Sequence, residues 1–306
     1  MLRCLSGAMT TFSIIIPTYG RPDQLADCLD TLIEVDPPSD GFEVIVVDDG
    51  TPEPLEPLLE PWRDRLPLKV LRQDNAGPGP ARNLGLTTAQ GEFIAFTDDD
   101  CYIDPDWLVV LESAIRKHPD ALLGGRTTQK PGDPYSETNQ LIFDAVHRFY
   151  NESGQGATFF PSNNMAVSAR LLREVGGFNP EFFPRASEDR ELCDRWRHLG
   201  HDLIYVPEAH LIHARPANFR RYWQQHFTYG RGAHHYHRLR AERGSGLLRD
   251  DAVFHRRLPS MLREPLGALP IKKRVEALSL IGVWQLANAA GYFTERFTAR
   301  NGPNSM

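Results

Sequence analysis

Short, continuous apolar runs constrain the fold of this chain more than any other feature of its sequence. Phe12–Pro17 and Phe42–Val47 are rich in Ile and Val, which is typical of strands buried on both faces of a parallel sheet. Leu68–Leu71 and Phe93–Phe96 are shorter runs of the same kind. Amphipathic, helix-like stretches separate these runs. The alternation predicts an α/β fold, with a mostly parallel, doubly wound sheet and helices on both of its faces.

The helices are predicted from apolar periodicity and from residues that start or end a helix. One helix follows Arg21-Pro22, with Leu25, Cys28, Leu29, Leu32 and Ile33 on one face; the others are Ala81–Ala89, a helix capped by Asp104 with Pro105 at its first position, and the stretches bracketed by Ser168 and Gly176 and by Ser187 and Gly200. Leu203–Val206 is a further predicted strand, and from Arg215 the pattern becomes helical and basic. We therefore expect a catalytic domain over residues 10–215 and a helical, basic extension over residues 216–306.

The overall composition is that of an ordinary folded globular protein. Of its 306 residues, 41% are hydrophobic and 24% are charged, so neither a disordered chain nor a multi-span membrane protein is expected. The four cysteines include no CxxC pair, which argues against a zinc ribbon and a secreted disulfide framework. Met1–Met9 contains no apolar run of signal-peptide length. We expect a reduced, cytoplasmic protein.

Charge is distributed unevenly along the chain. Residues 1–194 hold 16 Lys and Arg against 32 Asp and Glu, whereas residues 195–276 hold 16 against 7. Acidic clusters suit metal ions, and a basic segment suits phosphates or an anionic surface. The alternative for both parts is a solvated surface that binds nothing. No nucleic-acid partner is expected.

Carboxylates follow two of the predicted strands. Asp48-Asp49 ends the second strand, and Asp98-Asp99-Asp100 follows the fourth. Ligands of open α/β sheets bind at the carboxyl ends of the strands, where several like charges favour a divalent cation. Turn-forming Asp residues are the alternative, and for Asp49-Gly50 alone we prefer it. The first strand leads into Pro-Thr-Tyr-Gly-Arg-Pro rather than GxGxxG, which disfavours a dinucleotide-binding domain.

Six segments, taken together, resemble family 2 glycosyltransferases of the GT-A fold. They are IIIPTYGRPDQL, VVDDGT, NAGPGPARNLG, FTDDDC, SNNMAVSARLLREVGGF and SEDRELCDRWRHLG, in the order and approximate spacing of that family. The resemblance spans about two thirds of the chain, residues 11–215. It implies a nucleotide-sugar donor, usually a UDP-sugar, together with Mn²⁺ or Mg²⁺ and inversion at the anomeric carbon.

The resemblance also implies where the donor and the metal bind. The nucleotide would contact Pro17, Thr18, Tyr19, Asp48, Asp49, Asn75, Arg82, Asp98 and Asp99. Asp98 and Asp100 match the DxD metal-binding pair, with Asp100 the direct ligand, and His213 matches a residue that closes over the metal or diphosphate. Cys101 stands where the family often has another acid, which leaves the DxD positions intact. For Arg82 the alternative is a surface residue on a helix, and for His213 an ordinary strand-end histidine.

Asp189 matches the aspartate that the family uses as general base. The acceptor hydroxyl must lose its proton as it attacks the sugar, so the chemistry requires such a group. The alternative is a favourable charge at a helix N-terminus. Residues expected near the sugars or the diphosphate are Asn163, Asn164, Glu188, Arg221 and Arg231.

The segment Phe219–Gly232 mixes arginines with aromatic residues. Guanidinium groups suit a diphosphate and aromatic faces suit sugar rings, while the alternative is a helix that docks its aromatics onto the catalytic domain. His234, His235 and His237 have no Cys or carboxylate partner at metal-ligand spacing, so we expect a solvated basic turn there.

The function predicted is a metal-dependent, inverting glycosyltransferase that acts in glycan, polysaccharide or cell-envelope synthesis on a glycan or lipid-linked acceptor. The alternatives are a sugar-nucleotide pyrophosphorylase, which needs a Gly-rich first loop that this chain lacks, and a non-catalytic module, which would have lost the DxD or the ED acid. The acceptor would be selected by residues 124–156 and by the C-terminal extension.

Leu278–Phe293 is a largely apolar stretch of 16 residues, shorter than the roughly 20 that cross a bilayer. Its polar or small residues recur every third position, so a helix here has no clean amphipathic face. We expect it to pack on the catalytic domain or on a second subunit of a homo-oligomer. Because Lys272-Lys273-Arg274 precedes it, peripheral contact with the inner face of the cell membrane is the other interpretation.

Overall fold

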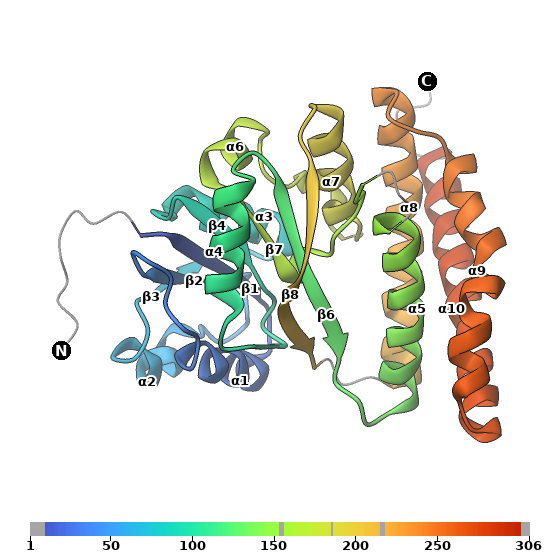
Figure 1. Ribbon diagram of the computed structural model, residues 1–306, viewed down its shortest axis with the longest axis horizontal. Coiled ribbons are helices and arrows are strands. Elements are labelled where there is room, and N and C mark those ends of the chain that lie inside the picture. Colours follow the sequence, from blue (N-terminus) through green and yellow to red (C-terminus); the bar gives the residue numbers. More distant parts are fainter. Residues whose placement is uncertain (1–9, 153–155, 185, 215–217, 301–306) are drawn as a thin grey trace.

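The structure is a computed structural model that describes residues 10–152, 156–184, 186–214 and 218–300. One sheet lies at its centre, and a group of long helices stands beside it (Figure 1). In the described residues the sheet contains β1 (Phe12–Thr18), β2 (Phe42–Asp48), β3 (Leu68–Arg72), β4 (Phe93–Phe96), β5 (Cys101–Ile103), β6 (Leu122–Gln129), β7 (Met165–Ser168) and β8 (Leu203–His213). The expected α/β fold with a helical C-terminal part is confirmed.

The helices alternate with the strands at first and then follow one another. They are α1 (Pro22–Ile33), α2 (Glu60–Arg63), α3 (Pro78–Thr88), α4 (Trp107–Lys117), α5 (Pro134–Asn151), α6 (Ala169–Glu174), α7 (Glu188–His198), α8 (Phe219–Arg243), α9 (Leu248–Ala268) and α10 (Ile271–Arg300), with short 3-10 turns at Glu56–Leu59, Ser162–Asn164 and Pro180–Phe182. None of the helices that the structure describes is both long enough and apolar enough to cross a membrane.

The strand order β3-β2-β1-β4-β7-β6-β8-β5 places the first four strands side by side. β1 pairs in parallel with β2 and β4, and β2 with β3, so their carboxyl ends meet at one edge. Thr18 lies opposite Asp48 in this register, and Ile15 lies opposite Phe96. The other half is mixed: β7 pairs antiparallel with β4 and β6, β5 pairs antiparallel with β8, and β6 pairs in parallel with β8.

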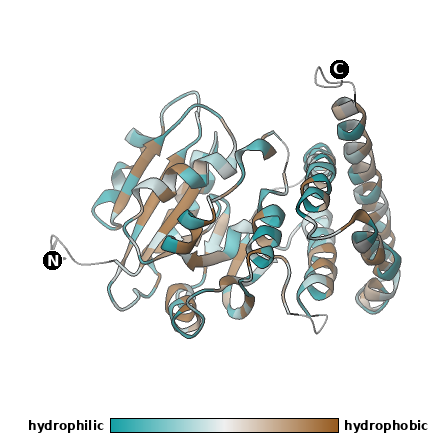
Figure 2. Cartoon of the chain, turned by 90° about the horizontal axis from the view of Figure 1, so that it is seen from above, coloured by the Kyte–Doolittle hydropathy of each residue, from teal (hydrophilic) through white to brown (hydrophobic). Residues whose placement is uncertain are grey.

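Both faces of the sheet are covered, as the continuous apolar strands predict. Ile14 and Ile16 pack with α1 and α4, whereas Ile15 points to the opposite face and packs with residues of α3, α6 and α7. All three side chains are fully buried. Because successive strand residues point to opposite faces, a strand between two helical layers must be apolar at every position. The brown strands of Figure 2 show this apolar layer.

The helices α5, α8, α9 and α10 share an aromatic core of their own. Tyr222 of α8, Phe254 of α9 and Trp284 of α10 are buried there. The Tyr222 hydroxyl donates to the Leu280 carbonyl oxygen, with 3.1 Å between the oxygens. Thus α10 packs on its own chain, while its apolar residues Ile271, Val275, Leu278, Leu286, Phe293 and Phe297 remain exposed. Apolar residues therefore lie on both the buried and the exposed faces of α10, as expected.

Two helices begin at other residues than predicted, and the first of them, α3, begins at Pro78 rather than at Ala81. The helix predicted from Asp104 begins at Trp107, with Asp106 as its cap, because the Asp104 carboxylate instead contacts His210 Nδ1 at 2.7 Å. The strand predicted at Leu203–Val206 extends to His213.

Other parts of the structure were not predicted, or were predicted differently. β5, β6, β7 and α5 were not predicted. The solvated turn expected around His234 is wrong, since these residues lie within α8 and His235 and His237 are buried. The expected domain boundary at residues 215 and 216 lies outside the described residues.

Contact between α8 and α10 depends on glycine. A Cβ atom on Gly291 would lie 2.0 Å from the Phe227 carbonyl oxygen, whereas one on Gly282 of the same helix meets nothing within 4 Å. We predict that Gly291→Ala lowers the free energy of unfolding by about 1–3 kcal/mol through overpacking. The matched variant Gly282→Ala should be neutral or stabilising by up to about 1 kcal/mol, because alanine favours helices. Urea unfolding measures both, and equal stabilities would contradict this packing.

Candidate active site

The carboxyl ends of β1 and β4 bring the first site residues together. The Thr18 hydroxyl donates to Asp99 Oδ2, with 2.7 Å between the oxygens. Arg21, in the loop between β1 and α1, donates from Nη1 to Asp99 Oδ1 at 2.9 Å and to Asp100 Oδ2 at 2.7 Å. These two carboxylates are almost fully buried. The guanidinium group therefore offsets part of the repulsion between neighbouring acids.

Arg82 of α3 connects this edge of the sheet to α7. Its Nη2 lies 2.7 Å from Asp98 Oδ1, and its Nη1 lies 3.3 Å from Glu188 Oε1. The residue is 2% exposed, and its guanidinium lies over the Phe178 ring at 5.3 Å from the centroid. The interpretation of Arg82 as a surface residue is therefore wrong. In the structure this guanidinium group links two acidic segments, and its predicted position near the donor stays a prediction.

The electrostatics of the site are those of crowded, buried carboxylates. Burial raises the pKa of Asp99 to about 7, against the attraction of Arg21. Burial and the nearby Asp189 raise the pKa of Glu188 to about 7, and burial also raises the pKa of Asp189. For Arg82, burial opposes the charged form, but Asp98 and Glu188 more than offset it, so the pKa is raised. A cationic ligand stabilises the charged form of such crowded, buried carboxylates.

Pairing of β5 with β8 brings Asp100 beside His213. Cys101 lies opposite His213 in the antiparallel register, and His213 Nε2 lies 3.0 Å from Asp100 Oδ1. A carboxylate oxygen and an imidazole nitrogen are donors that Mn²⁺ accepts, so this pair fits a divalent cation. Asp98 is turned toward Arg82. In the part of the chain that the structure describes, no three His, Cys, Asp or Glu side chains are arranged to hold a metal.

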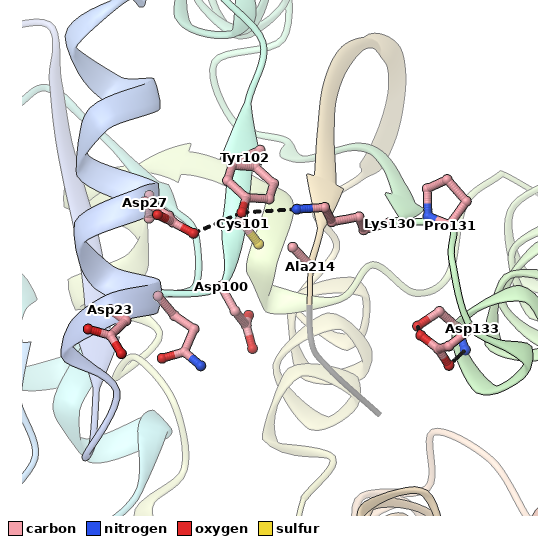
Figure 3. Close-up of a pocket in the computed structure, with 12 residues that line it drawn as sticks. Asp23, Asp27, Asp100, Cys101, Tyr102, Lys130, Pro131, Asp133 and Ala214 are labelled. Carbon is pink, nitrogen blue, oxygen red and sulfur yellow. Dashed lines mark hydrogen bonds between the residues drawn. The ribbon is translucent and has the colours of Figure 1, made fainter. Parts of the chain in front are cut away.

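On the α1 side, Asp100 lines a pocket of about 380 Å³ (Figure 3). Asp27 of α1 accepts a hydrogen bond from the Tyr102 hydroxyl, with 2.9 Å between the oxygens, and Lys130 Nζ donates to the same hydroxyl at 3.3 Å. Asp23 and Asp133 add two more carboxylates to the lining. The surroundings of Asp100 are therefore acidic on this side as well.

Asp189 lies in the first turn of α7, next to Glu188. Its Oδ1 accepts a hydrogen bond from the Arg190 backbone N–H, with 2.8 Å between the two atoms. It also lines a second, larger cavity of about 600 Å³, together with Asn163 and His213. The carboxylate predicted to act as the base thus reaches open space, as a base for an incoming hydroxyl must.

Asp48 and Asp49 hold loops together. Asp48 accepts from the Thr51 backbone N–H at 2.9 Å and forms an ion pair with Arg72. Asp49 accepts from the backbone N–H groups of Ala76 and Gly77 and from the side chains of Gln73 and Asn75. The turn-forming interpretation describes these contacts well. They also fix the loop that leads into α3 and Arg82.

Some of the other residues that were predicted to bind the donor or the sugars lie near the site, and others lie in the protein interior. Pro17 is buried in β1, and Tyr19 is 48% exposed beside it. Asn164 is fully buried, where its amide accepts from Trp107 Nε1 and donates to the Arg126 and Ala209 carbonyl oxygens. Its hydrogen bonds join β6, β8 and α4, so the structure does not bring Asn164 to the cluster.

Two further predicted residues are arginines of α8. Arg231 Nε lies 2.8 Å from Glu295 Oε2 of α10. Arg221 has an exposed side chain in the first turn of α8. Binding of the diphosphate by Arg221 and Arg231 stays a prediction.

Two arginines near the cluster were missed from the sequence. Arg21 was noted only as a helix opener, although a cation directly after the first strand was the available signal. Arg190, next to Asp189, pairs with Asp251 of α9 at 3.4 Å and lies over the rings of Tyr150 and Tyr236. Only the fold brings Asp251 close, because it is 61 residues away in the sequence.

Comparison with known proteins shows the family of the chain. Residues 13–176 match the family described as Glycosyl transferase family 2, and the chain belongs to that family. Over 117 residues, 38% of this chain, it is 38% identical to the poly(ribitol-phosphate) β-N-acetylglucosaminyltransferase TarS of Staphylococcus aureus. Over 238 residues, 67% of this chain, it is 37% identical to a hyaluronan synthase of Pasteurella multocida. These matches span 20% and 24% of the two relatives.

Solved structures share the fold. Staphylococcus aureus TarS 1-349 in complex with UDP-GlcNAc aligns with a TM-score of 0.59 at 19% identity, covering 97% of this chain and 93% of that one. The mannosyltransferase PcManGT from Pyrobaculum calidifontis, in complex with GDP-Man and Mn²⁺, aligns with a TM-score of 0.64 at 18% identity, covering 96% and 88%. The expected GT-A fold is confirmed.

We predict that Arg82→Met lowers the free energy of unfolding by about 3–5 kcal/mol, because it leaves the buried Glu188 and the partly buried Asp98 without their partner. Adding Glu188→Gln should recover part of this loss. The control is Arg170→Met, which removes an exposed pair with Glu174 and should cost less than about 1 kcal/mol. Denaturant unfolding measures all three, and an Arg82→Met variant as stable as the unmodified protein would exclude this role.

Proposed function

We propose that the protein is a metal-dependent, inverting glycosyltransferase that moves a sugar from a nucleoside diphosphate, with UDP-sugars as the preferred donors, to an acceptor hydroxyl. The observation that carries the proposal is the Arg82 bridge between Asp98 and Glu188. It joins the segment that would hold the donor to the segment that would deprotonate the acceptor. The proposed catalytic domain covers residues 10–215 and the proposed extension residues 216–306.

The donor site is proposed at the carboxyl ends of β1, β2 and β4. Pro17, Thr18, Tyr19 and the loop held by Asp49 would surround the nucleotide. UDP-GlcNAc is bound by TarS and GDP-Man by PcManGT, and both proteins share this fold. That likeness supports a nucleotide-sugar donor in the same place and leaves the sugar open.

Asp100 and His213 are proposed to hold Mn²⁺ or Mg²⁺, with Asp98 close by. A bound divalent cation would neutralise charge that develops on the diphosphate leaving group. The chain's own residues prepare this place: Arg21 holds Asp99 and Asp100 at fixed positions, and Arg82 does the same for Asp98. PcManGT contains Mn²⁺ in the same fold.

Asp189 is proposed as the general base. It would take the proton of the acceptor hydroxyl as the oxygen attacks the anomeric carbon from the side opposite the diphosphate. The Arg190 N–H orients one carboxylate oxygen. Burial raises the pKa of Asp189, and a raised pKa makes the carboxylate a stronger base.

Neither alternative accounts for the site as well. A pyrophosphorylase needs a Gly-rich loop after the first strand, and Pro17–Pro22 contains a single glycine. A non-catalytic module has no need for Asp98, Asp100 and Asp189 together, and family membership favours transfer.

A divalent cation at Asp100 gives the first prediction about activity. Asp100→Ala should lower sugar transfer by several orders of magnitude while the fold stays intact, because the leaving group loses charge neutralisation. Initial rates with Mn²⁺ and with EDTA, across UDP-, GDP- and dTDP-sugars, measure this. The control is Asp120→Ala, which removes an exposed carboxylate. Turnover by Asp100→Ala in EDTA at the unmodified rate would refute the role.

For the base, we predict that Asp189→Asn keeps donor binding and loses transfer, since the amide oxygen can still accept from Arg190 but cannot take a proton. Activity of the unmodified protein should fall on the acid side at a pH above the ordinary range of aspartate, because the group must be ionised and its pKa is raised. Donor titration and a pH–rate profile test both points. Substantial transfer by Asp189→Asn, beside a normal Asp120→Asn control, would contradict the assignment.

For location, we propose a cytoplasmic protein whose exposed residues on α10 rest on the inner face of the cell membrane, next to a glycan or lipid-linked acceptor. Leu278 and Leu286 are 51% and 65% exposed, and Lys272 adds charge.

Leu278→Asp with Leu286→Asp should abolish flotation with anionic liposomes at low salt. Leu199→Asp, at an equally exposed leucine elsewhere, should leave flotation unchanged. A full chain that stays at the bottom of the gradient would refute the proposal. A homo-oligomer through α10 is the competing proposal.

A further inference from the structure

The larger cavity beside Asp189 extends between the sheet and the long helices. On the sheet side it is lined by Thr127, Gln129, Asn163, Asp189 and His213. On the helical side it is lined by α5, α8, α9 and α10, which stand next to the sheet in Figure 1. One continuous space of about 600 Å³ thus joins the proposed base to the C-terminal helices.

The helical side of this cavity combines apolar and aromatic residues with polar ones such as Asn139, Gln225 and Gln285. Its lining includes Phe143, Val146 and Tyr150 of α5, Phe254 of α9, and Trp284, Ala289 and Phe293 of α10. Trp284 and Phe254 are almost fully buried, whereas Phe293 is 49% exposed. The lining therefore includes partly exposed residues of the helices as well as Asp189. A lining with a large apolar and aromatic share and some polar groups is typical of pockets for small ligands.

The lining carries little available positive charge. Arg190 is the one Arg or Lys among the described lining residues, and it is paired with Asp251. Burial lowers the pKa of His226 to about 3 and of His237 to about 4, so both rings are neutral at pH 7. The His226 ring also contacts Asn139 Oδ1 through Nε2 at 3.1 Å. Away from His213 and the cation proposed there, an anionic group such as a phosphate would meet only this paired arginine and these neutral rings.

We propose that this cavity selects an acceptor whose reacting hydroxyl is carried next to a neutral, apolar group. The hydroxyl would lie at Asp189 and the apolar group among Phe143, Trp284 and Phe293. The proposal rests on the proposed function, because it assigns the acceptor of that same site. It explains why the helical part contributes aromatic residues to a space that Asp189 also reaches.

Three glucosides that differ in one substituent test the proposal. They are methyl, phenyl and 4-carboxyphenyl β-D-glucopyranoside, titrated into the unmodified protein by isothermal calorimetry. Burial of the ring predicts that the phenyl compound binds at least about tenfold more tightly than the methyl compound. The carboxylate should remove most of this gain. Equal affinities for the phenyl and methyl compounds, or tighter binding of the carboxylate, would overturn the proposal.

Two variants on one helix locate the binding. Ala289→Trp fills the cavity from an exposed position that lines it, whereas Ala299→Trp makes the same change at an exposed position outside the lining. The preference for phenyl should disappear in Ala289→Trp and persist in Ala299→Trp. A preference that survives in Ala289→Trp, or disappears equally in both, places the apolar site elsewhere.

Donor hydrolysis separates this proposal from the proposed function. Hydrolysis of the active nucleotide sugar is measured in the unmodified protein, and it should be unchanged in Ala299→Trp, which lies outside the lining of the cavity. If the unmodified protein hydrolyses no donor but shows the phenyl preference, the transferase assignment fails and the apolar site stands. If the donor is hydrolysed but the phenyl compound is not preferred, the transferase assignment stands and the apolar site fails.

Discussion

The bridge that Arg82 makes between Asp98 and Glu188 is the contact on which the site depends. Asp98 follows β4, and Glu188 begins α7, about 90 residues later in the sequence. Without a cation between them, two buried acidic segments would repel each other and each would lose hydration. Because Arg82 is buried and contacts both Asp98 and Glu188, it fixes the proposed donor-binding segment next to the segment of the proposed base.

The long helices α8 and α9 also contact the segment that contains the proposed base. Gly232 of α8 approaches so closely that a Cβ atom there would lie 1.9 Å from the Ala186 carbonyl oxygen, two residues before Glu188. Arg190 reaches Asp251 of α9 in the same region. The position of Asp189 is thus supported from the sheet through Arg82 and from the helices through these contacts.

Sequence reasoning succeeded where one physical pattern dominates. β1, β2 and β4 were predicted because strands between two helical layers must be apolar throughout. β6 was missed because Gly124 and Gly125 interrupt its pattern; a Cβ on Gly124 would meet the Phe160 ring. The DxD and ED segments were found as motifs. Long-range packing determines three features that were not predicted: the connection of these segments through Arg82, the interior position of Asn164 and the pairing of Arg190 with Asp251. A local sequence pattern does not contain this information.

The proposed reaction is a single displacement, with Asp189 on the side of the anomeric carbon opposite the leaving diphosphate. The most direct test is the proton NMR spectrum of the first product formed from whichever nucleotide sugar is turned over. The coupling constant of the anomeric proton reports its configuration. A single displacement gives a product of configuration opposite to that of the donor, whereas a product that retains the donor's configuration would exclude this mechanism.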